Sequence, residues 1–302
     1  MKLRDAGPLL KRTWSEFQAD KAMTLGAALA FYTALSIAPL LLLVTVIAGV
    51  AFGEQATRGE IANQLNGLIG SEGAKAVEGM LASTRSPGGS LLSTVVGVVT
   101  LLFGATGVFT SLQDALNTVW NVKPEDSRSG IWGLVRDRFA SFTMICGMAF
   151  LLLVSLVFSA VLTALGGLVN EWLPWLPYGD VWMGAANLVL GFLITALMFA
   201  MIYKYLPHAR PAWSDVATGA VITAALFTLG KFLIGLYLGK ASIGSTYGAA
   251  GSFVVLLVWI YYSSLIVLFG AEFTQVYAQT HGSGLTPADR RRLAEKPDPL
   301  PA

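Results

Sequence analysis

Lys231 is the most unusual residue of the chain, because it interrupts an apolar run from Val216 to Leu238. An ionisable side chain within a membrane span costs about 2.5 to 3.5 kcal/mol on insertion scales and is usually retained for a function. Lys231 lies about 10 Å before the end of the run at 1.5 Å per residue. Two interpretations remain open: its stem reaches the nearer membrane surface, or its ammonium group binds an anionic headgroup.

Other polar residues are predicted at the depth of Lys231. Asn187 lies at a similar depth in the run 181–203, and Ser245 and Tyr247 follow in the connection after the fifth run. An amide, a hydroxyl and an ammonium group together suit a polar headgroup. We therefore predict Lys231, Asn187 and Tyr247 as substrate or headgroup ligands.

A second polar group is predicted near the opposite membrane surface. Glu272 lies about 20 residues into the last apolar run, and Gln113, Asp114 and Asn117 follow the second run at the same depth. These four residues are candidates for a hydrogen-bonded inner gate. The alternative is ordinary solvation of helix ends.

Proline and glycine add backbone features to the apolar runs. Pro39 removes a backbone hydrogen bond from the first run, so a kink is expected there, either as a hinge or as a common feature of membrane helices. Glycine pairs four residues apart, Gly235 with Gly239 and Gly244 with Gly248, are expected to allow close backbone packing.

The composition indicates which elements hold these residues. Apolar residues make up 55% of the 302 and charged residues only 13%, which excludes an ordinary soluble domain. Six apolar runs are long enough for helices that cross a ~30 Å hydrocarbon layer. They are 25–52, 91–109, 139–165, 181–203, 216–238 and 252–276. We predict an all-α polytopic membrane protein, with one six-transmembrane-helix domain over residues 1–280.

The basic residues predict the orientation of these helices. Four lie in the segments predicted outside, namely Arg58, Lys75, Arg85 and Lys240; Lys231 lies within a run, and the other fifteen of the 20 lie in segments predicted inside. Since lysine and arginine are retained on the cytoplasmic side, both termini are expected in the cytoplasm.

Amphipathic segments flank the runs. Leu3, Leu10, Trp14 and Phe17 form one stripe of a helix whose other face is charged, as in an interfacial helix on the inner leaflet. The outer loop 53–90 is expected to form two short amphipathic helices, and 127–138 is a weaker interfacial candidate. The tail 281–302 has the composition of a disordered cytoplasmic segment.

Three stretches resemble a known family. They are ALAFYTALSIAPLLLL (28–43), LQDALNTVW (112–120) and GSTYGAAGSFVVLLVWIYYSSLIVLFGAEF (244–273), and the similarity extends over residues 14–278. They are similar to the YihY/BrkB family of bacterial inner-membrane proteins. The resemblance implies six helices, the bacterial inner membrane and an uncertain activity, with members linked to virulence or suspected of moving lipid-like material.

The same family once carried a ribonuclease label, which the sequence does not favour. Its two histidines, His208 and His281, are far apart and have no acidic metal cluster beside them. No phosphate-binding Gly-x-x-x-x-Gly-Lys-Ser/Thr string occurs, and the single cysteine, Cys146, excludes an intrachain disulfide. We expect no catalytic residue, no cofactor, no metal and no nucleic-acid partner.

Two functions remain open. In the first, the helices enclose a path for lipid-like or anionic amphipathic molecules, with membrane lipids as partners, and the protein is a transporter or translocator. In the second, the helices form a closed, non-catalytic scaffold for envelope assembly.

Overall fold

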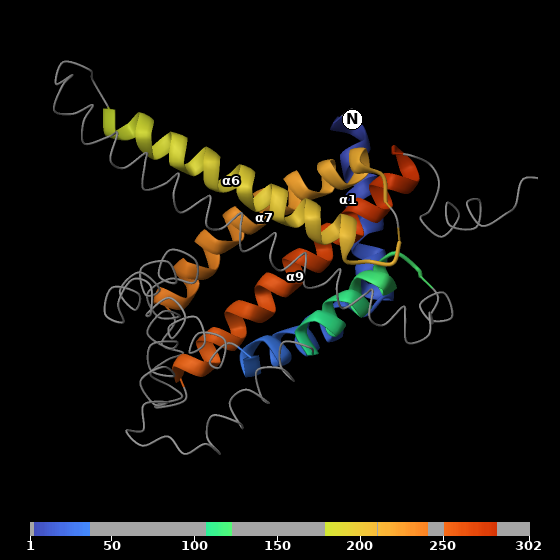
Figure 1. Ribbon diagram of the computed structural model, residues 1–302, viewed down its shortest axis with the longest axis horizontal. Helices are drawn as coiled ribbons and strands as arrows, with labels where there is room; N and C mark the ends of the chain where they lie inside the picture. The colour runs from blue at the N-terminus through green and yellow to red at the C-terminus, as the bar shows by residue number, and fades with distance from the viewer. Residues whose placement is uncertain (1–2, 37–106, 123–178, 210, 241–250, 283–302) are drawn as a thin grey trace, which may run out of the picture. The chain divides into compact units, whose positions relative to one another are not determined.

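The computed structural model describes residues 3–36, 107–122, 179–209, 211–240 and 251–282, and every regular element in these ranges is a helix (Figure 1). In chain order they are α1 (Leu3–Ala19), a helix at Ala22–Ser36, a helix at 107–119, α6 (Gly179–Tyr205), α7 (Trp213–Lys240) and α9 (Gly251–Thr280). The predicted all-α fold is confirmed for this part of the chain.

Three of the described helices contain a stretch that is long and apolar enough to cross a membrane. The stretches Gly184–Tyr205, Trp213–Ile234 and Phe253–Thr280 have 22, 22 and 28 residues, and about 20 are needed. The helix Ala22–Ser36 is apolar but shorter within the described residues.

Several predictions fall outside the described residues, so six spans and a single membrane domain stay predictions. The segments outside are residues 37–52 of the first run, residues 91–106 of the second, the run 139–165, the loop 53–90, the segment 127–138 and the tail from residue 283. The residues outside are Pro39, Cys146, Gly244, Ser245, Tyr247 and Gly248.

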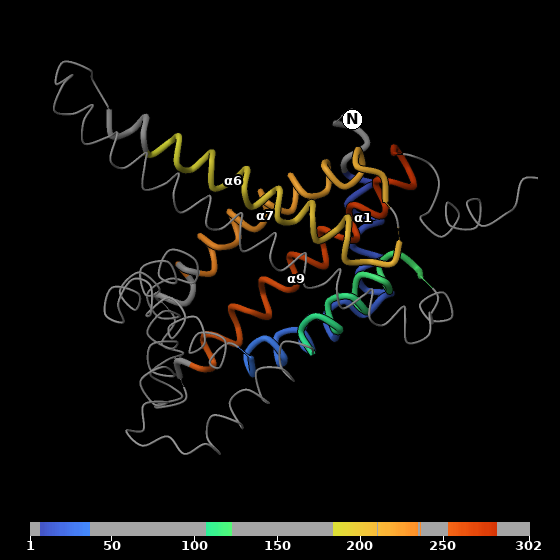
Figure 2. The backbone as a smooth tube through the Cα atoms, viewed as in Figure 1, coloured from blue at the N-terminus to red at the C-terminus, as the bar shows by residue number. Residues whose placement is uncertain are grey.

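The connection between α6 and α7 is short and contains two prolines (Figure 2). Pro207 and Pro211 lack the backbone N–H that would continue a helix. The new helix then starts at Trp213, and the carbonyl of Ala212 accepts hydrogen bonds from the N–H groups of Asp215 and Val216. The carboxylate of Asp215 in the first turn complements the helix dipole. Local backbone chemistry therefore sets this corner.

The helix 107–119 ends in a left-handed cap. Asn121 has a φ of 53°, and its N–H donates to the carbonyl of Thr118 at 2.9 Å. The N–H of Val122 donates to the carbonyl of Asn117, also at 2.9 Å. This is the Schellman pattern, in which asparagine is the usual substitute for glycine. The cap satisfies the carbonyl groups of Asn117 and Thr118 at the end of the helix.

The chain divides into two compact units, one of residues 1–16, 116–225 and 270–302 and the other of residues 17–115 and 226–269. In the second unit, Phe17, Ala22, Ala115 and Leu268 form a buried cluster. The ring of Phe17 meets that of Phe269 edge to face, with centroids 5.8 Å apart. This cluster joins the end of α1 to the middle of α9.

The first unit is built around the C-terminal half of α9. Its buried residues there are Ala271, Glu272, Phe273, Thr274, Gln275, Val276 and Ala278. Because they cover more than a full turn, α9 is enclosed on every side at this level. Leu9 of α1 and Ile222 of α7 pack against Phe273 and Val276. Trp120 and Ala209 cover Ala278.

Two Gly-x-x-x-Thr sequences bring α7 and α9 into close contact in this unit. A Cβ added to Gly219 of α7 would lie 2.7 Å from Thr274 Cβ, and one added to Gly270 of α9 would lie 2.8 Å from Thr223 Cβ. Each threonine hydroxyl donates to the glycine carbonyl of its own helix, Thr223 to Gly219 at 2.7 Å and Thr274 to Gly270 at 2.6 Å. The hydroxyls are satisfied and the backbones approach through the glycine notches, as in small-residue packing of membrane helices.

Gly219→Ala and Gly270→Ala should each lower the free energy of unfolding by about 1 to 3 kcal/mol, because overpacked cores lose this much. Gly191→Ala on α6 is the matched control, since nothing lies within 4 Å of its added Cβ. Alanine should be neutral or slightly stabilising there through its better helix propensity. Thermal unfolding of the purified protein in detergent measures the three effects. Equal stability of all three variants would contradict the close contact.

Candidate functional site

Lys231 lies on an exposed face of α7. Leu229, Phe232 and Leu233 around it are also exposed, so the lysine projects from an apolar helix surface. A molecule that approaches α7 from the side therefore reaches the ammonium group. This arrangement leaves both interpretations of Lys231 open, a stem that reaches the membrane surface and an ammonium group that binds a headgroup.

The described residues do not test whether the other predicted headgroup ligands lie beside Lys231. Asn187 is exposed on the N-terminal half of α6, in the first unit, whereas Lys231 is in the second. Tyr247 lies outside the described residues. A shared site of Lys231, Asn187 and Tyr247 stays a prediction.

The four predicted gate residues differ in burial. Glu272 is fully buried, Gln113 and Asn117 are half-buried, and Asp114 is exposed. Solvation of a helix end therefore describes Asp114 but not Glu272. Gln113 and Asp114 belong to the second unit, Asn117 and Glu272 to the first. The gate itself stays a prediction.

Asn117 has a specific partner that the sequence did not suggest. Its Oδ1 accepts the backbone N–H of His208 at 2.8 Å, and its Nδ2 lies 2.9 Å from His208 Nδ1. Since an amide nitrogen only donates, Nδ1 accepts, which assigns the ring proton to Nε2. These two bonds fasten the end of the helix 107–119 to the connection between α6 and α7. Asn117 thus has a structural role, which is to hold the end of its helix against His208.

Further buried polar groups surround the C-terminal half of α9. Tyr203 of α6 donates its hydroxyl to Thr223 Oγ1 at 3.1 Å, and both residues are buried. Trp120 Nε1 and Gln275 Oε1 are buried without a hydrogen-bond partner among the described residues. Such atoms are rare, because each costs about 1 to 3 kcal/mol. With the carboxyl group of Glu272, this region offers hydrogen-bonding groups in an otherwise packed core.

The histidine and acidic side chains of the described residues form no metal-binding cluster. Within residues 3–36, 107–122, 179–209, 211–240 and 251–282, no group of three or more His, Cys, Asp or Glu side chains could hold a metal ion. Of the two histidines, His208 contacts Asn117, and His281 stacks on Tyr277 with ring centroids 5.9 Å apart. We assign neither histidine a catalytic role.

An aromatic and basic anchor lies where α6 ends and α7 begins. Lys204 Nζ donates to the carbonyl of Pro211 at 2.6 Å and lies 5.5 Å from the centroid of the Trp213 ring. Tyr205 meets the same ring edge to face at 5.9 Å. Lysine, tyrosine and tryptophan gather where membrane helices meet water. In the sequence, the positions of Tyr205 and Trp213 beside two prolines could have indicated this anchor.

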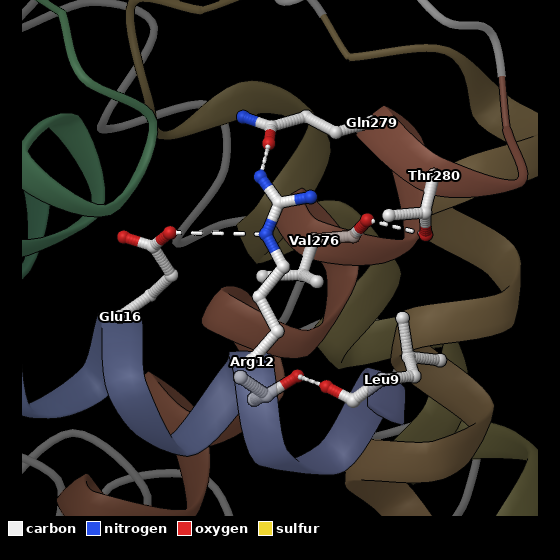
Figure 3. Close-up of polar contacts among 7 residues, drawn as sticks. Leu9, Arg12, Glu16, Val276, Gln279 and Thr280 are labelled. Atoms are coloured by element: carbon white, nitrogen blue, oxygen red, sulfur yellow. Dashed lines mark hydrogen bonds and ion pairs between the residues drawn. The ribbon is translucent and has the colours of Figure 1, made fainter. Parts of the chain in front are cut away.

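Arg12 ties α1 to the end of α9 (Figure 3). Its guanidinium group donates to Gln279 Oε1 at 2.5 Å and lies 3.9 Å from the carboxylate of Glu16. Because the side chains of Arg12 and Glu16 are 46% and 38% exposed, their ion pair contributes less than about 1 kcal/mol. The buried contact of Leu9 with Phe273 and Val276 is the stronger link.

Comparison with known proteins places the chain among membrane proteins. The family described as Virulence factor BrkB matches residues 13–294. A UPF0761 membrane protein of Stenotrophomonas maltophilia (strain R551-3) is 26% identical over 273 residues, covering 88% of this chain and 59% of the relative. A UPF0761 membrane protein of Aeromonas salmonicida (strain A449) is 27% identical over 279 residues, 89% of either protein. The chain thus spans 59% of the length of the Stenotrophomonas relative. No solved structure matches the chain.

Asn117→Ala should lower the free energy of unfolding by about 2 kcal/mol, since two hydrogen bonds are lost and the N–H of His208 loses its acceptor. Asn117→Asp should cost less, because a carboxylate still accepts from that N–H and also from Nδ1 once the ring proton moves there. Thr110→Ala, at an exposed position of the same helix, is the control. Thermal unfolding in detergent measures all three. An Asn117→Ala variant as stable as the control would contradict the fastening role.

Proposed function

We propose that this chain, which belongs to the Virulence factor BrkB family, is a transporter or translocator of lipid-like or anionic amphipathic molecules in the bacterial inner membrane. Its helices cross the membrane six times, with both termini in the cytoplasm. The proposal assigns no catalytic residue, cofactor or metal. Membrane lipids are its partners.

The exposure of Lys231 is the observation that carries this proposal. A lysine in an apolar helix is costly, and this one is reachable from the side of α7. A headgroup that moves along the helix surface meets its ammonium group while the acyl chains remain in lipid. An anionic phosphate or carboxylate is the natural counter-charge. The proposed substrate therefore enters from the bilayer rather than from water.

The enclosure of Glu272 supports a closed end of the path. Its carboxyl group is fully buried in α9, so a substrate reaches it only after the surrounding helices separate. Gln113, Asp114 and Asn117 complete the proposed inner gate. The hydrogen bonds of Asn117 to His208 stabilise the closed arrangement.

A non-catalytic scaffold for envelope assembly is the second candidate. A lysine among exposed leucine and phenylalanine side chains is also expected if its stem lies along the apolar surface and its ammonium group reaches the membrane surface. In that case the tightly packed α7 and α9 would serve as a fixed support for partner proteins.

Vesicles containing the purified protein and fluorescent phosphatidylglycerol or phosphatidylcholine separate the two candidates. A transporter should accelerate exchange of the anionic lipid between leaflets, measured as the fraction of probe quenched by dithionite. Lys231→Ala should slow this exchange about tenfold, the effect of losing ~1.5 kcal/mol of charged hydrogen bonding. Lys231→Arg keeps the charge and should retain most of the activity.

Asp114→Ala should also weaken exchange, because it removes a carboxylate from the proposed gate. Each variant is first shown to unfold at the wild-type temperature in detergent. If the folded wild-type protein exchanges lipid no faster than empty vesicles do, the transport proposal is wrong and the scaffold is favoured.

A further inference from the structure

One face of α1 is packed within the protein. Leu9, Thr13 and Phe17 follow one another at four-residue spacing, and all three are buried. Leu9 contacts Phe273 and Val276 of α9. This packed face differs from the predicted stripe. Of the stripe residues whose side chains are described, only Phe17 lies on the packed face.

A second apolar strip on α1 is left exposed. Leu10 and Trp14 were predicted to share the stripe of Phe17, but their side chains are 49% and 46% exposed. Being four residues apart, they lie on the same side of the helix. At about 100° per residue, this side adjoins the packed face rather than coinciding with it. The helix is therefore held by one face while the neighbouring apolar strip remains accessible.

Lys11 borders the exposed strip. It is exposed, and it lies about 60° around the helix from Trp14. Arg12, by contrast, is on the far flank and is engaged by Glu16 and Gln279. A leucine and a tryptophan beside a lysine are typical of a helix that lies in a membrane surface.

We propose that Leu10, Trp14 and Lys11 form a binding surface for anionic lipid in the cytoplasmic leaflet. Leu10 and Trp14 enter the boundary of the acyl chains, and the Lys11 ammonium group contacts headgroup phosphates. Two observations favour lipid over a protein partner. The strip carries a basic residue that matches anionic headgroups, and α1 packs on α9, which is long and apolar enough to cross a membrane.

This surface does not depend on transport. Because the packed face of α1 touches α9 close to Glu272, the lipid surface holds the enclosed end of α9 in place. The binding surface would serve a scaffold as well as a transporter.

Spin labels on the full chain test the proposal. Cys146 is the single cysteine, so Cys146→Ser gives a background in which Leu10→Cys, Trp14→Cys and Ser15→Cys are labelled one at a time. The protein is placed in vesicles of phosphatidylcholine with or without phosphatidylglycerol. Power saturation with oxygen and with a water-soluble nickel complex then reports the depth of each label.

Labels at positions 10 and 14 should be reached by oxygen, and the label at the exposed Ser15 by nickel. Phosphatidylglycerol should draw the label at position 14 deeper. Lys11→Gln should abolish this shift and Lys11→Arg should preserve it. Lys75→Gln, which removes the same charge from a segment predicted outside, should leave the shift unchanged.

Three outcomes would overturn the proposal. Labels at 10 and 14 as accessible to nickel as the label at 15 would place the strip in water. Protection of these labels from both reagents would indicate a protein partner. If the depth of the label at position 14 does not depend on phosphatidylglycerol or on Lys11, anionic lipid is not the ligand.

Discussion

The close approach of α7 and α9 is the contact on which the described structure depends. Gly219 and Gly270 leave notches that Thr274 and Thr223 fill, and the threonine hydroxyls bond back to the glycine carbonyls. Because these hydroxyl groups are hydrogen-bonded, their burial in an apolar contact costs little free energy, and the two backbones can pack closely. The C-terminal half of α9 can then be enclosed on all sides, which brings Glu272 into the interior.

Polar contacts at helix ends complete this enclosure. Asn117 bonds to His208, and Trp120, one turn later, covers Ala278 at the end of α9. The left-handed cap at Asn121 lets the chain leave without breaking these contacts. Lys204, stacked over Trp213, fixes the corner between α6 and α7. The LQDALNTVW stretch thus contributes fastening residues, where the sequence alone left a gate and ordinary solvation of helix ends open.

Lys231 and Glu272, two of the ionisable residues in the apolar helices, have opposite environments. Lys231 is exposed on α7 and Glu272 is enclosed in α9. An exposed cation can bind a ligand without any movement of the helices, whereas an enclosed carboxyl group requires them to separate. The proposed translocator uses the exposed cation for ligand binding and the enclosed carboxyl group for the gate.

The sequence by itself determined the helical character of the described segments, because the length and apolarity of a run are local properties, and it identified Lys231 as a costly residue. It did not determine which face of α1 is packed. Leu9 and Leu10 are adjacent and equally apolar, and only the contact of Leu9 with Phe273 and Val276 separates them. Likewise, Asn117 and His208 are 91 residues apart. Such choices depend on partners distant in the chain, so only the tertiary structure decided them.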